Sequence, residues 1–220
     1  LNFTKIVQLT NIRKYWLAIL FFCFQLNICI FSTYAEASGG YDNGTAIKKG
    51  KIGIDLTWNL FNIFPNGQSY AVLSYGITDK FNIHGYYSMP SKGADNYYIG
   101  IFYQFYNNNN LDLATAIGIR NYNPKAEQHI FAPQLLYTLH LKDDYHIGGS
   151  IVQLIDINRN NKFIGRAFDI AIIKNLYKNE ISNLKVYSID FCIGAFKPAI
   201  WSPKGYGWHP TYSIDLKFNI

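Results

Sequence analysis

The sequence has few charged residues, which argues against a surface that faces water on all sides. Charged residues make up 15% of the chain, whereas soluble domains carry about 25%. Cysteine is also scarce, because Cys23 and Cys29 lie in an N-terminal apolar segment and Cys192 stands alone beyond it. A single cysteine excludes an internal disulfide in the rest of an exported chain. The stability of the fold must therefore come from closure of a hydrogen-bonded sheet.

Long hydrophobic runs are missing after the first 40 residues. Hydrophobic residues make up 49% of the chain, yet the mean hydropathy is −0.03, so apolar and polar residues are finely interleaved. The one apolar run, Tyr15 to Phe31, follows three basic residues and precedes Ala35-Glu36-Ala37. This order predicts a secretory signal peptide over residues 1–37, followed by a periplasmic N-terminal segment over residues 38–50. A retained membrane helix is the alternative, since the run has about the minimum length for spanning a bilayer.

What the sequence has in abundance is alternation with a period of two. In the last ten residues, the apolar members are Tyr212, Ile214, Leu216, Phe218 and Ile220. A period of two places them on one face of a strand. The same pattern predicts ten strands, at residues 51–60, 69–77, 81–89, 96–106, 111–120, 130–141, 145–155, 164–173, 184–196 and 211–220. Each is close to the 9–11 residues that cross a bilayer at a tilt.

Side-chain size predicts which face of each strand points inward. The face opposite the bulky residues is rich in small ones, for example Gly53, Gly100, Ala114 and Ala171. Small residues suit the inside of a narrow barrel, whereas a soluble barrel or sandwich would place the bulky face inside. We therefore predict an all-β fold. It is a closed antiparallel up-and-down transmembrane β-barrel of about ten strands (eight is the alternative) over residues 51–220, preceded by a signal-peptide helix.

The connections between strands agree with this prediction. Residues 78–80, 107–110 and 142–144 form short turns, whereas the intervening connections are mostly longer and rich in Gly, Pro or Asn. Short periplasmic turns that alternate with longer external loops are typical of bacterial barrels. The connection over residues 174–183 departs from this pattern, because it should be short and is not.

The chain beyond the signal peptide resembles the small outer-membrane β-barrel proteins of Gram-negative bacteria. The segment Ser74 to Ile83 looks like one of their periplasmic hairpins, and the C-terminal strand looks like their assembly signal. The resemblance is one of architecture and implies a porin-like protein of the cell envelope, located in the bacterial outer membrane. It also implies recognition by the barrel-assembly machinery through Tyr212, Ile214, Leu216 and Phe218.

Ionisable residues on the predicted inner face form the first candidate site. We expect an acidic cluster in the lumen, at one level on neighbouring strands, formed by Asp55, Asp169, Asp190 and Asp215. Its expected basic partners are Lys51, Lys185, Lys217 and Arg120. Charges at membrane depth must be paired or hydrated. The cluster is either a packed salt-bridge network that keeps the barrel shut or a water path that favours cations.

The loop from Lys197 to Pro210 is the second candidate site. It is long and aromatic, and its candidate contact residues are Trp201, Lys204, Tyr206, Trp208 and His209. Exposed aromatic residues suit contact with a glycan or another protein, although the loop could instead fold inward. Basic residues of the outer loops could pair with lipopolysaccharide phosphates, so outer-membrane lipid and lipopolysaccharide are expected partners.

Catalysis and nucleic-acid binding are not expected. The histidines show no metal-ligand spacing, and His146 and Ser150 lie too far apart along one strand for a hydrogen bond. The net charge of +6 is not gathered into a basic helix or stripe. We expect no catalytic residues, metal or cofactor. The expected role is structural or surface interaction. The alternatives are a narrow channel for small, preferably cationic, solutes and a rim enzyme that acts on lipid A or peptides.

Overall fold

The protein was analysed as a computed structural model of the 220-residue chain. The structure describes residues 43–59, 68–90, 96–123, 128–158, 160–177, 186–197 and 208–219. The predicted signal peptide and the alternative membrane helix lie outside the described residues. No helix in the described ranges is long and apolar enough to span a bilayer.

The described chain is built from antiparallel strands, as the alternation predicts. The strands are β1 (Lys51–Asn59), β2 (Gln68–Gly76), β3 (Phe81–Pro90), β4 (Asn96–Asn107), β5 (Leu111–Asn123), β6 (Gln128–Phe131), β7 (Gln134–His140), β8 (Tyr145–Asp156), β9 (Lys162–Tyr177), β10 (Val186–Lys197) and β11 (His209–Asn219). Both β6 and β7 pair with β5 on one side and with β8 on the other, so together they occupy one place in the wall. The wall therefore has ten places, and the prediction of a ten-strand barrel is confirmed.

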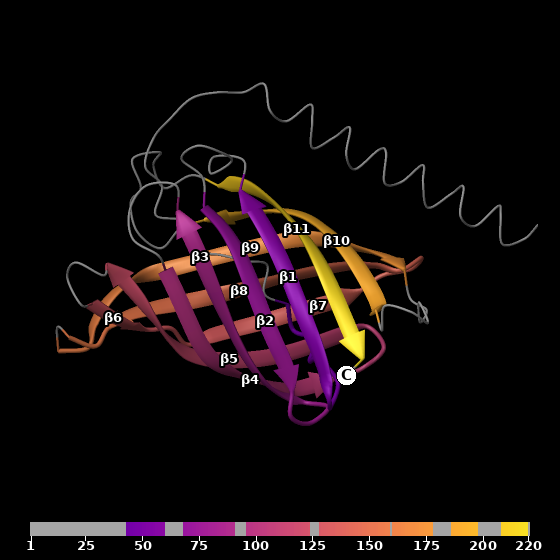
Figure 1. Cartoon of the computed structure of the whole chain (residues 1–220), viewed down its shortest axis with the longest axis horizontal. Coiled ribbons are helices and arrows are strands. Elements are labelled where there is room, and N and C mark those ends of the chain that lie inside the picture. Colours follow the sequence, from indigo (N-terminus) through magenta and orange to yellow (C-terminus); the bar gives the residue numbers. More distant parts are fainter. Residues whose placement is uncertain are drawn as a thin grey trace, which may run out of the picture. The chain divides into compact units, whose positions relative to one another are not determined.

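The sheet closes on itself. With β6 and β7 counted as one wall strand, each strand pairs with its neighbour along the chain, and β1 also pairs with β11, from Lys51 opposite Asn219 to Asn59 opposite Thr211. In Figure 1 the indigo β1 and the yellow β11 lie side by side in the wall. Closure satisfies the backbone of every strand without leaving an open edge, which is what a bilayer requires of a sheet.

The break between β6 and β7 has a local cause. Pro133 has no N–H to donate to the ladder, and it interrupts the strand predicted over residues 130–141. The neighbouring backbone groups remain bonded, because Ala132 N donates to Gly118 O at 2.9 Å and Gln153 N donates to Pro133 O at 2.9 Å. The wall stays continuous across the break.

The outer face carries many bulky apolar side chains, and the buried polar side chains face inward. Ile99 is 63% exposed and Ile101 is 41% exposed, whereas Asp190 is 3% and Ser213 0% exposed. A soluble protein would place these isoleucines in its core. The barrel is therefore inside-out, its outer surface matches hydrocarbon, and its architecture is that of an outer-membrane β-barrel.

The two ends of the barrel differ, and we name them by their connections. The turn end carries the tight connections at residues 77–80, 108–110 and 141–144, together with the end of β11. Asp143 and Asp144 both have positive φ, 58° and 60°, as a two-residue hairpin turn requires. The opposite end, where β1 finishes and β11 begins, is called the loop end.

Candidate functional site in the barrel lumen

A segment ahead of β1 runs inside the barrel, and we call these residues, Asn43 to Gly50, the N-terminal strap. Its backbone is bonded to several parts of the wall. Gly44 N donates to Thr138 Oγ1 of β7 at 2.9 Å, and Ala46 N donates to Gln104 Oε1 of β4 at 3.0 Å. Lys49 N donates to Asp79 Oδ1 in the β2–β3 turn at 3.1 Å. The strap therefore crosses the lumen at the turn end.

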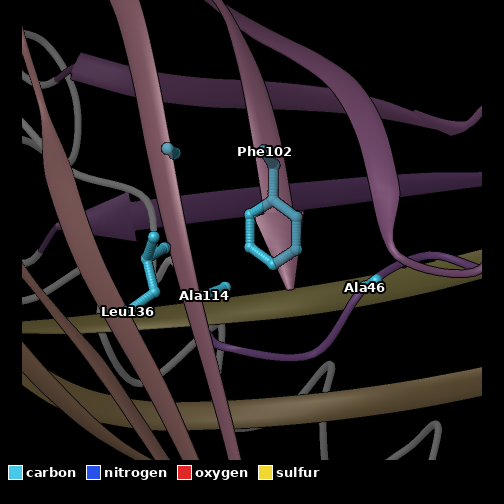
Figure 2. Packing of buried hydrophobic residues seen from close by; sticks show 5 residues of the cluster. Ala46, Phe102, Ala114 and Leu136 are labelled. Carbon is cyan, nitrogen blue, oxygen red and sulfur yellow. The ribbon is translucent and has the colours of Figure 1, made fainter. Parts of the chain in front are cut away.

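The strap also packs against the inner wall. Ala46 is buried together with Phe102 of β4, Ala114 of β5 and Leu136 of β7. Figure 2 shows Ala46 on the strap below the side chain of Phe102, with Leu136 on the other side. At Gly44 an added Cβ would come within 2.7 Å of Asp112 O, so only glycine allows this close approach to the wall.

Asp112 is the main polar anchor of the strap. Its carboxylate is fully buried and accepts hydrogen bonds from Thr45 Oγ1 at 2.7 Å and from Asn107 Nδ2 at 2.6 Å. His140 Nε2 lies 3.0 Å from the same Oδ2 atom that Thr45 contacts. One carboxylate thus joins the strap, the β4–β5 turn and β7.

Beside the strap lies a chamber of about 500 Å³ in the turn-end half of the lumen. Its ionisable lining residues are Lys48, Asp55, His84, Asp112, His140, His146, Asp190, Asp215 and Lys217. Four carboxylates therefore face two lysines across a space large enough for several water molecules. The lining therefore carries more carboxylates than ammonium groups.

Three of the aspartates form a row across neighbouring strands. Asp215 of β11 lies directly opposite Asp55 of β1 on one side and Asp190 of β10 on the other. Like charges placed opposite each other on one sheet face destabilise it. Lys217 Nζ relieves this repulsion in part through its ion pair with Asp190 Oδ2 at 2.6 Å. Hydroxyl groups also stabilise these carboxylates, because Ser213 Oγ donates to Asp215 at 3.1 Å and Thr57 Oγ1 donates to Asp55 at 2.6 Å.

The structure brings together Asp55, Asp190, Asp215 and Lys217 from the predicted cluster, but it places Asp169 elsewhere. Asp190 lies opposite Asn175 of β9. Asn175 is six residues along the strand from Asp169, or roughly 20 Å at the strand rise. Asp169 instead accepts hydrogen bonds from the backbone N–H and the hydroxyl of Ser150. Counting residues from the strand ends misplaced it, because the strand was predicted to end at residue 173, whereas β9 continues to Tyr177.

The predicted basic partners also lie in different places rather than together beside the aspartates. Arg120 is buried and lines a separate pocket of about 50 Å³ together with Asp169, and no ion pair of Arg120 occurs among the described residues. Lys51 Nζ lies 4.1 Å from the centre of the Tyr187 ring, a cation–π contact. Lys185 lies outside the described residues. Within the described chain, only Lys217 of the four pairs with the acidic row.

In the loop-end half of the lumen, the described side chains include a packed cluster. Tyr98, Ile130, Ala132 and Leu154 form a buried cluster, and Tyr86 packs against it. The rings of Tyr86 and Tyr98 stack with their centres 5.6 Å apart. The 50 Å³ pocket is the space that remains beside this cluster, enough for a few water molecules. We call Tyr86, Tyr98, Ile130, Ala132 and Leu154 together the aromatic layer.

Part of the second candidate site can be described. Trp208 is 53% exposed, and His209 begins β11 opposite Phe196 of β10. Trp201, Lys204 and Tyr206 lie outside the described residues. The assembly-signal side chains Tyr212, Ile214, Leu216 and Phe218 are half-buried along β11, next to β1.

Sequence reasoning missed the strap, Asp112 and the contact between His140 and His146. One signal could have found the histidines, because a hairpin centred on the turn at residues 142–144 sets residue 140 opposite residue 146. Asp112 follows the alternation of β5 inward and could have been added to the lumen residues. Nothing in the alternation indicates where the strap lies, because it precedes the first strand.

Comparison with known proteins yields distant likenesses only. No protein-family model matches the chain, and no curated protein sequence matches it. Among solved structures, a KdgM porin has a TM-score of 0.47 and 7% identity, covering 77% of this chain and 99% of that one. A bacterial polysaccharide outer membrane secretin has a TM-score of 0.31 and 8% identity, covering 77% of this chain and 98% of that one. At these values neither likeness assigns a function.

Proposed function

We propose that this protein is an outer-membrane barrel with a structural or surface-interaction role and a lumen closed to free passage. The observation that carries the proposal is that the lumen is obstructed twice. The aromatic layer packs inside the loop-end half, and the N-terminal strap crosses the turn end. An open pore needs a continuous water path, and both features would narrow such a path.

The outer surface suits this role. Its apolar side chains face hydrocarbon, and the loop end presents the exposed Trp208 next to the start of β11. Lipopolysaccharide and outer-membrane lipid are the proposed partners, with the loop over residues 197–210 as the contact surface. The proposed location is the bacterial outer membrane, with the loop end outside. Insertion would use the C-terminal strand.

Planar-bilayer recording of the purified barrel tests the closed lumen. We expect no steady conductance from the wild-type protein. Tyr98→Gly combined with deletion of strap residues 43–50 should conduct in bursts, because the two changes remove the ring that stacks on Tyr86 and lies over the wall glycines as well as the strap. The outward-facing Tyr97→Gly is the matched control and should stay silent. Steady conductance from the wild type would overturn the proposal.

A second candidate function is a narrow channel that favours small cations. The specific observation in its favour is the chamber, where Asp55, Asp190 and Asp215 outnumber Lys217. If wild-type barrels conduct steadily, Asp55→Asn should lower the permeability ratio of K⁺ to Cl⁻. Asp79→Asn, in the exposed β2–β3 turn, should leave that ratio unchanged. Equal ratios in wild type and Asp55→Asn would exclude the acidic row as the selectivity element.

A further inference from the structure

Two histidines meet at the turn end of the chamber. His140 ends β7 and His146 lies directly opposite it on β8. Their Nδ1 atoms are 3.0 Å apart, and the planes of their rings stand at 87° to each other. Both residues line the chamber and are half-buried. The two Nδ1 atoms therefore face each other at the edge of the chamber.

Asp112 fixes the orientation of one of these rings. Its Oδ2 lies 3.0 Å from His140 Nε2, so the neutral His140 ring donates its Nε2 proton to the carboxylate and keeps its Nδ1 lone pair facing His146. Asp112 is itself held by Thr45 and Asn107. Histidines that bind metals almost always donate their second ring nitrogen to such a carboxylate or to another acceptor.

We propose that His140 and His146 bind a divalent transition-metal ion through their Nδ1 atoms, with Asp112 orienting His140. Metal–imidazole bonds are about 2.0–2.1 Å long. With nitrogens 3.0 Å apart, the angle at the metal is then roughly 95°. This angle suits adjacent positions of a square-planar or octahedral ion better than those of a tetrahedral one. Copper(II) and nickel(II) have the fitting geometries, and copper(II) binds more tightly.

The surroundings suit an exchangeable ion. No group of three or more His, Cys, Asp and Glu donors that could hold a metal occurs among the described residues. Water from the chamber would therefore complete the coordination shell. The row formed by Asp55, Asp190 and Asp215 adds negative charge to the same chamber, which favours a cation there.

The competing interpretation is a plain hydrogen bond between the two rings, in which His146 Nδ1 donates its proton to His140 Nδ1. That bond needs one Nδ1 proton, whereas metal binding needs two Nδ1 lone pairs. Metal binding would move the proton of His146 to its Nε2 atom, with no change to the contact between His140 and Asp112. The two interpretations differ in whether a metal ion binds with one-to-one stoichiometry.

Titration of the tag-free barrel with copper(II) in detergent micelles tests the proposal. We expect one equivalent to bind, with an electron paramagnetic resonance spectrum that shows two coordinated nitrogens. His146→Gln should weaken binding at least tenfold while leaving the contact between His140 and Asp112 in place. Asp112→Asn should weaken it by about 10–100-fold, the usual effect of removing a partner behind a ligand.

His129→Gln is the control, because this exposed histidine lies at the loop end, away from the chamber. Its copper affinity should equal that of the wild type. Retained slow migration of unheated samples in gel electrophoresis would show that each variant is folded. Absence of one-to-one copper binding in the folded wild type, or unchanged affinity in folded His146→Gln, would overturn the proposal. Neither result depends on whether the barrel conducts.

Discussion

The two halves of the lumen share one wall but are filled in different ways. In the loop-end half, large side chains such as Tyr98 and Leu154 reach inward and pack against each other. In the turn-end half, the inward residues are mostly short and polar, and they leave the chamber and the space for the strap. The alternation of the strands is the same in both halves. The size of the inward side chains therefore decides where the barrel is solid and where it is hollow.

The largest expected effect concerns a glycine in the solid half. A Cβ at Gly118 would collide with the Tyr98 ring and with the backbone oxygen of Ile99. At Gly53, in the hollow half, the nearest atom is the flexible end of the Ile47 side chain. Gly118→Val should therefore lower the free energy of unfolding by about 3 kcal/mol or more, and Gly53→Ala by less than about 1 kcal/mol.

Urea titration of the two glycine variants in lipid vesicles measures this difference. Equal losses would contradict the division of the lumen into a solid half and a hollow half.

The next effect concerns the anchor of the strap. Asp112→Ala leaves Thr45, Asn107 and His140 without their buried acceptor. Loss of a buried charged partner should cost about 3 kcal/mol of unfolding free energy. Protease digestion should also cut the variant near residue 45 faster than the wild type. Asn109→Ala, in the exposed adjoining turn, should change neither measurement.

A smaller effect is expected in the acidic row. Lys217→Met removes the ion pair with Asp190 and takes one positive charge away from the row of three neighbouring aspartates. Hydrogen bonds to charged groups contribute about 1.5–3 kcal/mol to the free energy of unfolding. Because Lys217 is partly exposed, we expect the variant to lose an amount near the lower end of this range. Raising NaCl from 0.05 to 1 M should recover part of it through screening. Lys80→Met, in an exposed turn, serves as the matched control.

The smallest effect is expected from a single strap hydroxyl. Thr45→Val keeps the shape of the side chain but loses the hydrogen bonds to Asp112 and Thr138. One such hydrogen bond contributes about 1 kcal/mol to the free energy of unfolding. Hydrogen exchange of the strap amides should speed up about fivefold, while exchange in β4 and β5 stays unchanged. Unchanged exchange at Gly44 and Ala46 would show that backbone contacts alone hold the strap.

The sequence by itself predicted about ten wall positions with eight as the alternative, the strand limits to within a few residues and the face that the alternating side chains use. Ile99 and Ile101 alternate with Gly100, and that local pattern leaves one orientation for the strand. The break at Pro133 could also have been predicted, because proline has no backbone N–H to donate to a hydrogen bond between strands.

The tertiary structure alone decided which inward residues share a level. Asp169 was expected beside Asp190, yet the pairing of β9 with β10 sets Asp190 opposite Asn175 and Asp169 opposite Phe196. It also decided that the strap crosses the lumen, because its bonds join residues 30 to 94 positions apart in the chain. Alternation is a property of neighbours along one strand. The position of a residue along the barrel and the obstruction of the lumen depend on contacts between segments far apart in the sequence. A pattern along one strand gives no information about such contacts.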